Sequence, residues 1–197
     1  MDRKYYPLTG LTALYLANVL TDIAASYIAS THRYFSPGQK ADWATEQNSE
    51  NLYADDKLMD TFYGSKSEKI VFTVTGVSEE ENSHILGIYY DAASGRSYSV
   101  GDESPPFSAL GIKMKKGKSD YVYVWFPKGT ITGGNIVSET KKDGVTISVR
   151  EYTFNAVVTD AEFDVNGVQK GISWVKGDTT AAAFSGSSWF NQVQTPL

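Results

Sequence analysis

The sequence predicts one mainly β domain with a single short helix. The chain has 197 residues, of which 41% are hydrophobic, and this suits one packed domain over residues 1–197. Tyr and Gly are plentiful, and both favour strands and tight turns over helices. Several stretches also alternate with a period of two, which is the pattern of a strand with two unlike faces.

The first third of the chain predicts little regular structure. Residues 1–10 are expected to form a loose N-terminal arm. The apolar stretch over 11–19 fits a helix and a buried strand equally well by periodicity. Residues 29–51 are polar and contain Ser36-Pro37-Gly38, so they predict a long loop that runs into an extended strand.

A strand followed by a helix is predicted next. Residues 68–76 alternate, with Ile70, Phe72 and Val74 on one face. Ser78 then stands three residues before Glu81, which is the spacing of a capping box. With Gly87 as a C-terminal stop, this pattern predicts a helix over 79–86.

Strands dominate the second half of the chain. We predict them over 107–114, 121–126, 130–140 and 145–158. Asp143-Gly144 lies between the last two and predicts a hairpin turn, since both residues tolerate positive φ. The apolar face of 145–158 shifts by one residue near Arg150, which predicts a β-bulge there.

Residues 178–197 are predicted to form a C-terminal arm rich in Ala, Ser and Thr. This arm carries Trp189 and Phe190, two large rings that are expected to be docked. They could pack on the subunit's own core or on a neighbouring subunit, and the second alternative makes them candidates for a subunit interface.

Charge and composition exclude several classes of function. The net charge is −5 and there are no cysteines, so a disulfide framework and a thiol nucleophile are impossible. Lys113, Lys115, Lys116 and Lys118 are interpreted as a solvated turn between two strands, not as a nucleic-acid site. Residues 11–28 are too interrupted for a signal peptide or a membrane span, so a protein made in the cytoplasm is expected.

Catalytic and metal-binding patterns are weak. His32 and His84 have no partner at metal-ligand spacing, and Asp55-Asp56 would point to opposite sides of a strand. The acidic run Asp160, Glu162, Asp164, Asn166, Gly167 lacks the full ligand set of a calcium loop and is interpreted as an acidic turn. We therefore expect no enzyme, no cofactor and no metal.

The order of several short motifs resembles the major tail tube proteins of long-tailed bacteriophages. The resemblance covers nearly the whole chain, and each piece is weak alone. The pieces are GLTALYLA at 10–17, LYADD at 52–56, ILG at 85–87, PPFSALG at 105–111, YVYVWFPK at 121–128, ETK at 139–141 and SWF at 188–190.

This resemblance implies a tail-tube fold, which is a β-sandwich or small barrel with long hairpins and one flanking α-helix. It also implies a strand over 11–19. The function implied is that of a structural virion protein: hexameric rings stack into the tail tube and DNA passes through the lumen. The implied partners are further copies of the chain, a tape-measure protein, a tail terminator and distal tail or baseplate proteins.

A lumen that passes DNA without holding it needs a wall that is not basic. We therefore expect lumen-facing side chains among Glu46, Glu50, Asp55, Asp56 and Glu139; ordinary solvated surface carboxylates are the alternative. The competing function is a β-sandwich module that binds a receptor or carbohydrate through exposed aromatic residues such as Tyr63, Tyr89 and Tyr90.

Overall fold

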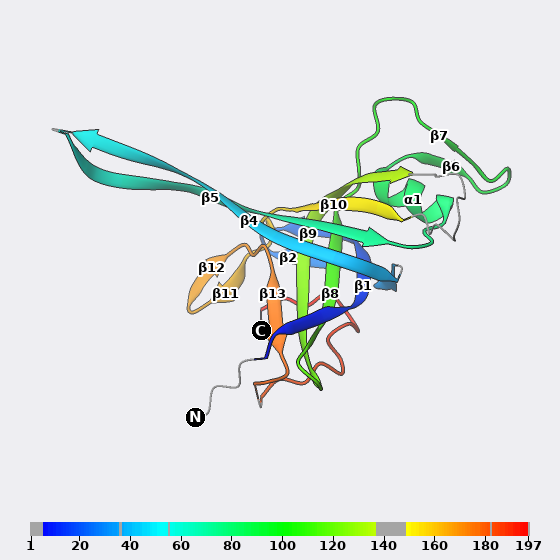
Figure 1. Ribbon diagram of the computed structural model, residues 1–197. Helices are drawn as coiled ribbons and strands as arrows, with labels where there is room; N and C mark the ends of the chain where they lie inside the picture. Colours follow the sequence, from blue (N-terminus) through cyan, green and yellow to red (C-terminus); the bar gives the residue numbers. More distant parts are fainter. Residues whose placement is uncertain (1–5, 36, 55, 137–148, 182, 197) are drawn as a thin grey trace, which may run out of the picture.

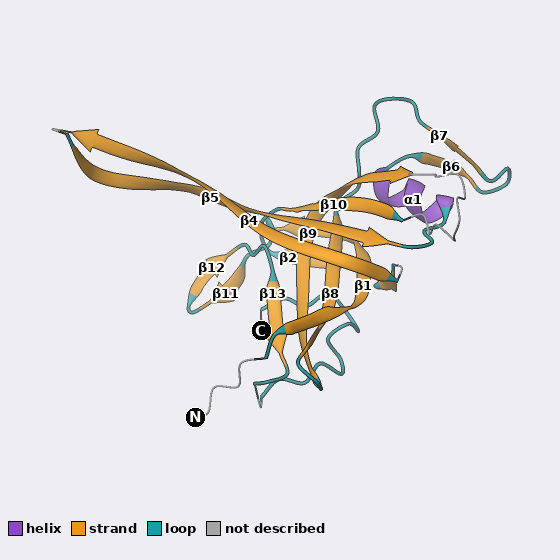
Figure 2. Ribbon diagram, viewed as in Figure 1, coloured by secondary structure: helices purple, strands orange, loops and turns teal. Residues whose placement is uncertain are grey.

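The protein is mainly β, with one short helix beside its sheets (Figures 1 and 2). The computed structural model describes residues 6–35, 37–54, 56–136, 149–181 and 183–196. Its elements are β1 (Leu8–Ile23), β2 (Ser26–Ala29), β3 (Arg33–Tyr34), β4 (Gly38–Ala54), β5 (Lys57–Val74), α1 (Glu79–Leu86), β6 (Tyr89–Asp91), β7 (Arg96–Tyr98), β8 (Ser108–Lys116), β9 (Asp120–Ile136), β10 (Arg150–Ala156), β11 (Phe163–Val165), β12 (Val168–Lys170) and β13 (Val175–Asp178).

One large antiparallel sheet organises the molecule, in the order β2-β1-β8-β9-β10-β5-β4. Strand β9 is its hub, because its first half pairs with β8 and β13 and its second half pairs with β10. The sheet curls around its core without closing into a barrel. The mainly β fold with one short flanking helix expected from the sequence is therefore confirmed, and the sheet is open and not a closed barrel.

The main core lies inside this curl. Ile70, Phe72 and Val74 of β5 are fully buried, as the alternation over 68–76 predicted. Tyr152 and Phe154 of β10 face the same core, and the ring of Tyr152 stacks on that of Phe72 at 5.7 Å. The Tyr152 hydroxyl donates to Oδ1 of Asn82 at 2.8 Å, which satisfies its buried polar atom and joins α1 to the core.

A second, smaller core lies on the other face of β8 and β9, where the C-terminal segment packs. Trp125 is fully buried there and its Nε1 donates to the carbonyl of Trp189 at 3.2 Å. Phe190 stacks on Tyr15 at 4.2 Å. A side chain at Gly111 would approach the rings of Phe190 and Trp125 to 2.9 Å, so a glycine there lets both rings lie flat against β8.

Helix α1 has the bounds that the sequence predicts, Glu79–Leu86. The N–H of Glu81 donates to Oγ of Ser78 at 3.1 Å, and Gly87 adopts the left-handed conformation that ends the helix. Three glutamates in the first turn face the positive end of the helix dipole. Local chemistry alone therefore fixes both ends of this helix.

The predicted long loop over 29–51 is wrong for most of its length. Residues 38–51 belong to the 17-residue strand β4, and β3 occupies Arg33–Tyr34. The outer half of β4 shows no alternation of apolar and polar residues, because both of its faces are exposed. The predicted N-terminal arm is also wrong for residues 8–10, since β1 begins at Leu8.

Two other predictions about the strands need correction. Lys113, Lys115 and Lys116 lie on β8 and only Lys118 lies in the turn that follows. The separate strands predicted over 121–126 and 130–140 are one strand, β9, as far as Ile136. It continues through Pro127 because the pairing register with β8 shifts at this point, where a missing N–H is tolerated.

The predicted bulge is present, but its extra residue is on the neighbouring strand. Glu151 and Tyr152 of β10 pair with Asn135 and Gly133 of β9, so Gly134 is the additional residue. Gly133 and Gly134 both have positive φ, which strands with side chains avoid. The predicted hairpin turn at Asp143-Gly144 lies outside the described residues.

Candidate assembly surfaces

A long hairpin formed by β4 and β5 projects from the body of the molecule (Figure 1). Its base is anchored by the buried carboxylate of Glu68. This carboxylate accepts hydrogen bonds from Nε1 of Trp43 at 2.6 Å and Oγ1 of Thr45 at 2.5 Å. About ten residues of each strand extend beyond that base, a reach of roughly 30 Å at the usual rise of a strand.

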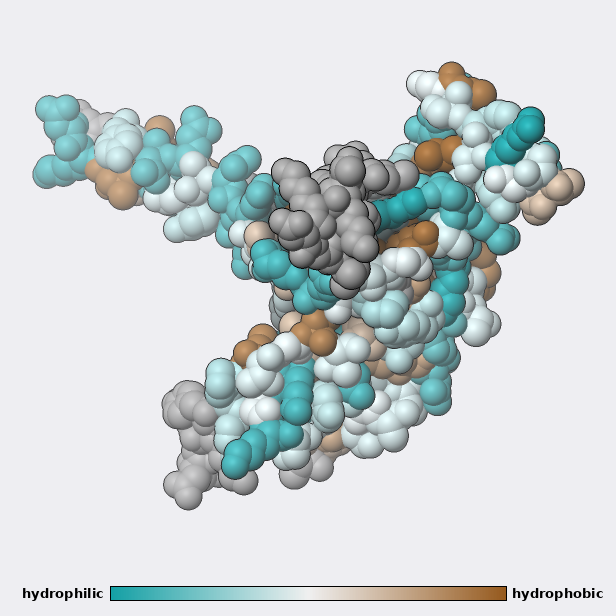
Figure 3. Space-filling view, turned by 45° about the vertical axis from the view of Figure 1, so that its right-hand side comes forward, coloured by the Kyte–Doolittle hydropathy of each residue, from teal (hydrophilic) through white to brown (hydrophobic). Residues whose placement is uncertain are grey.

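The outer part of this hairpin exposes large apolar side chains on both of its faces. Residues directly opposite each other share a face, so Leu52 and Phe62 lie on one side, with their partners Asp60 and Glu50. Tyr53 and its partner Leu58 lie on the other side. All four apolar side chains are more than half exposed, and Figure 3 shows brown patches among the teal surface of the projecting hairpin.

Such a ribbon is not stable by itself. A two-stranded hairpin without cover is marginal in water, and exposed apolar patches of this kind mark contact surfaces. Nothing among the described residues of the chain packs against the outer hairpin. The geometry therefore indicates that another molecule covers it.

The large sheet also ends in two margins with unused hydrogen-bonding groups. Within the described part of the chain, β4 pairs only with β5 and β2 pairs only with β1. β4 contains no proline, and a long strand with a free edge is a template for pairing with another chain. The two margins lie at opposite ends of the strand order, so one copy could extend the sheet of the next.

The structure gathers three of the five candidate lumen residues on the projecting hairpin. Glu46 and Glu50 are exposed on β4, and Asp56 is exposed in the turn at its tip with a φ of 56°. Asp55 and Glu139 lie outside the described residues. Of the two candidates for a subunit interface, Trp189 is 8% exposed in the second core of its own subunit, and Phe190 packs beside it. Contact of either ring with a neighbouring subunit stays a prediction.

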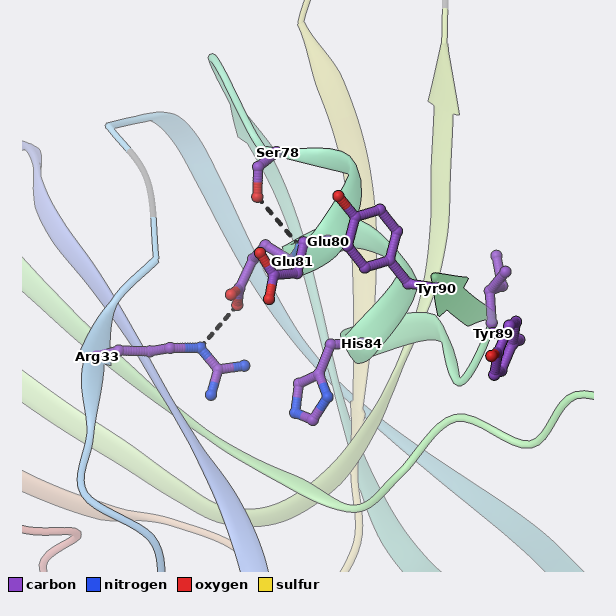
Figure 4. A pocket seen from close by; sticks show the side chains of 8 residues that line it. Arg33, Ser78, Glu80, Glu81, His84, Tyr89 and Tyr90 are labelled. Atoms are coloured by element: carbon purple, nitrogen blue, oxygen red, sulfur yellow. Dashed lines mark hydrogen bonds and ion pairs between the residues drawn. The ribbon is translucent and has the colours of Figure 1, made fainter. Parts of the chain in front are cut away.

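A pocket of about 500 Å³ lies beside helix α1 (Figure 4). Arg33 lines this pocket, and its guanidinium group is already paired, because its Nε donates to Oε1 of Glu81 at 2.7 Å. Tyr89 and Tyr90 are consecutive on β6 and their rings point in different directions in Figure 4. Tyr63 lies far away on the projecting hairpin. These three tyrosines therefore form no common stacking platform for a sugar.

Of the residues that were interpreted as an acidic turn, Asp164, Asn166 and Gly167 lie in the hairpin of β11 and β12, whereas Asp160 precedes β11 and pairs with Lys128. Asn166 and Gly167 both have positive φ, which is the signature of the two-residue turn that Asn-Gly favours. This signal was present in the sequence. The carboxylate of Asp164 accepts a hydrogen bond from the N–H of Gly167 at 2.7 Å, so it stabilises the turn.

The two histidines lie apart: Nε2 of His84 contacts the side-chain amide of Asn18, and His32 packs edge-on against Tyr15.

Comparison with known families decides what this architecture belongs to. A family model described as phage tail tube protein matches residues 44–194, which includes the projecting hairpin, α1 and the strands from β5 to β13. The chain belongs to the phage tail tube protein family. It is a structural component of the virion tail, as the sequence resemblance indicated. A search of curated proteins finds no match.

Membership of this family implies assembly into a tube with other tail proteins. The exposed hairpin and the free sheet margins are surfaces that the described residues of the subunit leave uncovered. A structural role of this kind is non-enzymatic. No helix in the described part of the chain is long and apolar enough to cross a membrane.

Proposed function

We propose that this tail tube protein closes into hexameric rings, that the rings stack into the tail tube, and that DNA passes through the lumen during ejection. The observation that carries this proposal is the β4–β5 hairpin, whose two faces both expose large apolar side chains. A single exposed apolar face could be an incidental patch. Two exposed apolar faces need a neighbouring molecule on each side of the hairpin. Contacts around a ring and between rings supply two different neighbours.

The free margins of the sheet support closure into a ring. When the edge of β4 in one copy meets the opposite margin of the next copy, every subunit uses two unlike surfaces. Heterologous contacts of this kind generate a ring if the rotation closes, and closure removes the exposed edges. The tendency of bare edges to aggregate is then used for assembly.

The acidic residues of the hairpin support a lumen that does not retain DNA. Glu46 and Asp56 are exposed carboxylates on an element that leaves the body of the subunit. Carboxylates release no counterions from DNA, so a wall that carries them repels phosphate. The proposal extends to Asp55, Glu139 and Glu50. A ring structure that places all five on the outer wall would contradict it.

Assembly is proposed to take place in the cytoplasm of the host cell. The partners are a tape-measure protein, a tail terminator and distal tail or baseplate proteins, and no cofactor is required. Aromatic stacking on carbohydrate is not favoured as a second function, because Tyr63 lies on the hairpin, away from Tyr89 and Tyr90, and the rings of these two point in different directions.

Electron microscopy of the purified protein tests the proposal. The wild-type chain is expected to form rings and stacked tubes as its concentration rises. In the double variant Tyr53→Ser/Leu58→Ser the concentration needed for assembly should rise at least about tenfold, since burial of two large apolar side chains is lost. Unfolding of its monomer should stay within about 0.5 kcal/mol of wild type, because both side chains are more than half exposed.

A matched control uses another exposed apolar side chain. Val100 is 76% exposed on the loop after β7, and Val100→Ser should leave assembly unchanged. Equal assembly of Tyr53→Ser/Leu58→Ser and wild type would remove the hairpin from the proposed contacts. A wild-type protein that stays monomeric at every concentration, alone and with other tail proteins, would overturn the proposal itself.

A further inference from the structure

A second apolar surface lies on the body of the molecule, in a hollow between the start of β1 and the start of β4. The hollow has a volume of about 270 Å³. Leu8, Leu11 and Met114 line it, together with Gly10 and residues of β4. Leu8 is 57% exposed, so the hollow opens onto the surface. A cavity of this size and lining accepts one large apolar side chain.

Lysines surround this hollow. Lys40 lines it but is already paired with Asp42 on the same strand, and Lys115 is the ladder partner of Gly10. Lys115 and Lys118 are exposed at the adjoining end of β8. Between residues 113 and 123 the chain has four lysines and one aspartate. The hollow is thus apolar in its floor and basic at its margin.

The projecting hairpin has the opposite charge. Between residues 46 and 66 the chain has five carboxylates and two lysines. On one face of the hairpin, Phe62 is 59% exposed and lies opposite Glu50, while Leu52 lies opposite Asp60. On this face the two apolar side chains lie on one diagonal and the two carboxylates on the other, so each apolar side chain has an acidic neighbour and the face complements the hollow in charge.

We propose that the hairpin of one copy docks head to tail on a second copy, with Phe62 in the hollow beside Gly10 and with Glu50 and Asp60 facing Lys115 and Lys118. The inference rests on the proposed function and names the surface that receives the hairpin. The hairpin projects away from the body, so the contact joins two copies (Figure 1). The contact is heterologous and continues from copy to copy, as the stacking of rings requires. It assigns Glu50 to the contact and leaves Glu46 and Asp56 as lumen candidates.

Two substitutions remove the two halves of this contact separately. Phe62→Ala removes the inserted ring. Gly10→Leu fills the hollow, and it does so without strain because a Cβ at Gly10 meets nothing within 4 Å. Each variant alone is expected to form rings that do not stack, as seen by electron microscopy. When preformed rings of the two variants are mixed, the intact hairpins of a Gly10→Leu ring can dock in the intact hollows of a Phe62→Ala ring. Neither ring can bind a third one, so assembly should stop at pairs of rings.

The charges are tested by reversal. Glu50→Lys/Asp60→Lys should lose stacking, and addition of Lys115→Glu/Lys118→Glu in the same chain should restore it. The control Asp102→Lys/Glu162→Lys makes the same change of charge at two exposed sites elsewhere and should stack like wild type. If Glu50→Lys/Asp60→Lys and Lys115→Glu/Lys118→Glu each abolish stacking and the variant with all four changes does not restore it, the proposed charge pairing is overturned.

Cross-linking tests the contact directly. The chain has no cysteine, so Asp60→Cys/Lys118→Cys introduces the only two thiols and leaves Phe62 and Gly10 in place. Mild oxidation of its tubes should give a ladder of linked copies on a non-reducing gel. Asp60→Cys/Asp102→Cys is the control and should give none. Wild-type tubes together with unlinked Asp60→Cys/Lys118→Cys tubes would overturn this docking and leave the proposed function standing, whereas the absence of wild-type tubes would count against the proposed function.

Discussion

At the scale of single residues, a buried ion cluster joins three distant parts of the chain. Nζ of Lys128 on β9 lies 2.6 Å from Oδ2 of Asp22 on β1 and 2.7 Å from Oδ2 of Asp160. The side chains of Lys128 and Asp22 are 9% and 5% exposed. Asp22 also accepts the N–H groups of Asp160 and Ala161 at 3.0 and 2.8 Å. Every charge at this junction therefore has a partner.

Lys128→Met should destabilise the fold by about 3 kcal/mol, because it leaves the buried carboxylate of Asp22 without its cation. Urea unfolding of the monomer measures the effect. Lys118→Met is the control, since Lys118 is exposed in a turn, and it should change stability by less than about 0.5 kcal/mol. A loss at Lys128 no larger than that of the control would show that the cluster contributes nothing.

The same cluster predicts a dependence of stability on acid pH. Burial of Asp22 opposes its ionisation, but the hydrogen bond from Lys128 and the two backbone N–H groups outweigh burial, so the pKa of Asp22 lies below its ordinary value of 3.8. A carboxyl group with a lowered pKa stabilises the fold above the ordinary value, and this contribution is lost as pH falls through the lowered pKa. Asp22→Asn should lose that part of the acid dependence, as measured by urea unfolding at a series of pH values. If the stability of Asp22→Asn depended on pH in the same way as that of wild type, this prediction would be contradicted.

At the scale of elements, helix α1 and the β4–β5 hairpin show two kinds of stability. The helix has eight residues, too few to be stable alone, and relies on its caps and on burial of Ile85. The outer hairpin has ladder hydrogen bonds but no packed face. What the outer hairpin lacks is burial of its apolar side chains, which contact with neighbouring subunits would supply.

Ser78→Ala removes the side chain that caps α1, and should cost about 1 kcal/mol in the free energy of unfolding. Ser119→Ala changes an exposed serine in the turn before β9 and serves as the control. Thermal unfolding of both variants by circular dichroism makes the comparison. If Ser78→Ala unfolds at the same temperature as Ser119→Ala, the cap is not needed to hold the helix.

At the scale of the whole molecule, the C-terminal segment closes the second core over β8 and β9. Trp189 packs against Phe184 at 5.1 Å between ring centroids, and its carbonyl accepts from Trp125. Its own Nε1 is buried and has no partner among the described residues. The ring therefore stabilises the subunit through packing and not through a hydrogen bond.

Trp189→Ala should cost about 3–5 kcal/mol in the monomer, because it leaves a cavity in a closed core. Trp189→Phe removes no hydrogen bond and keeps an apolar ring, so its cost should be clearly smaller. Urea unfolding below the concentration of assembly separates this role from an interface. A Trp189→Ala monomer as stable as wild type that fails to form rings would instead place the ring in a subunit contact.

The sequence by itself determined the parts of this protein that depend on local chemistry. Ser78, Glu81 and Gly87 specify both ends of α1 because caps act over three or four residues. Alternation over 68–76 specified the buried face of β5, and Asn166-Gly167 carried a turn signal that was available but was interpreted as an acidic turn. The ordered motifs also indicated the tail tube family, which the match over residues 44–194 confirmed.

Only the tertiary structure decided how distant segments meet. The outer part of β4 has no alternation, because neither of its faces packs on its own subunit, so its strand appears only through pairing with β5. The bulge on β9, the ion pair of Asp22 with Lys128 and the packing of Trp189 on Trp125 join residues that are 16 to 106 positions apart. No short pattern records such contacts, because their energy comes from burial and pairing that exist only once the whole sheet has formed.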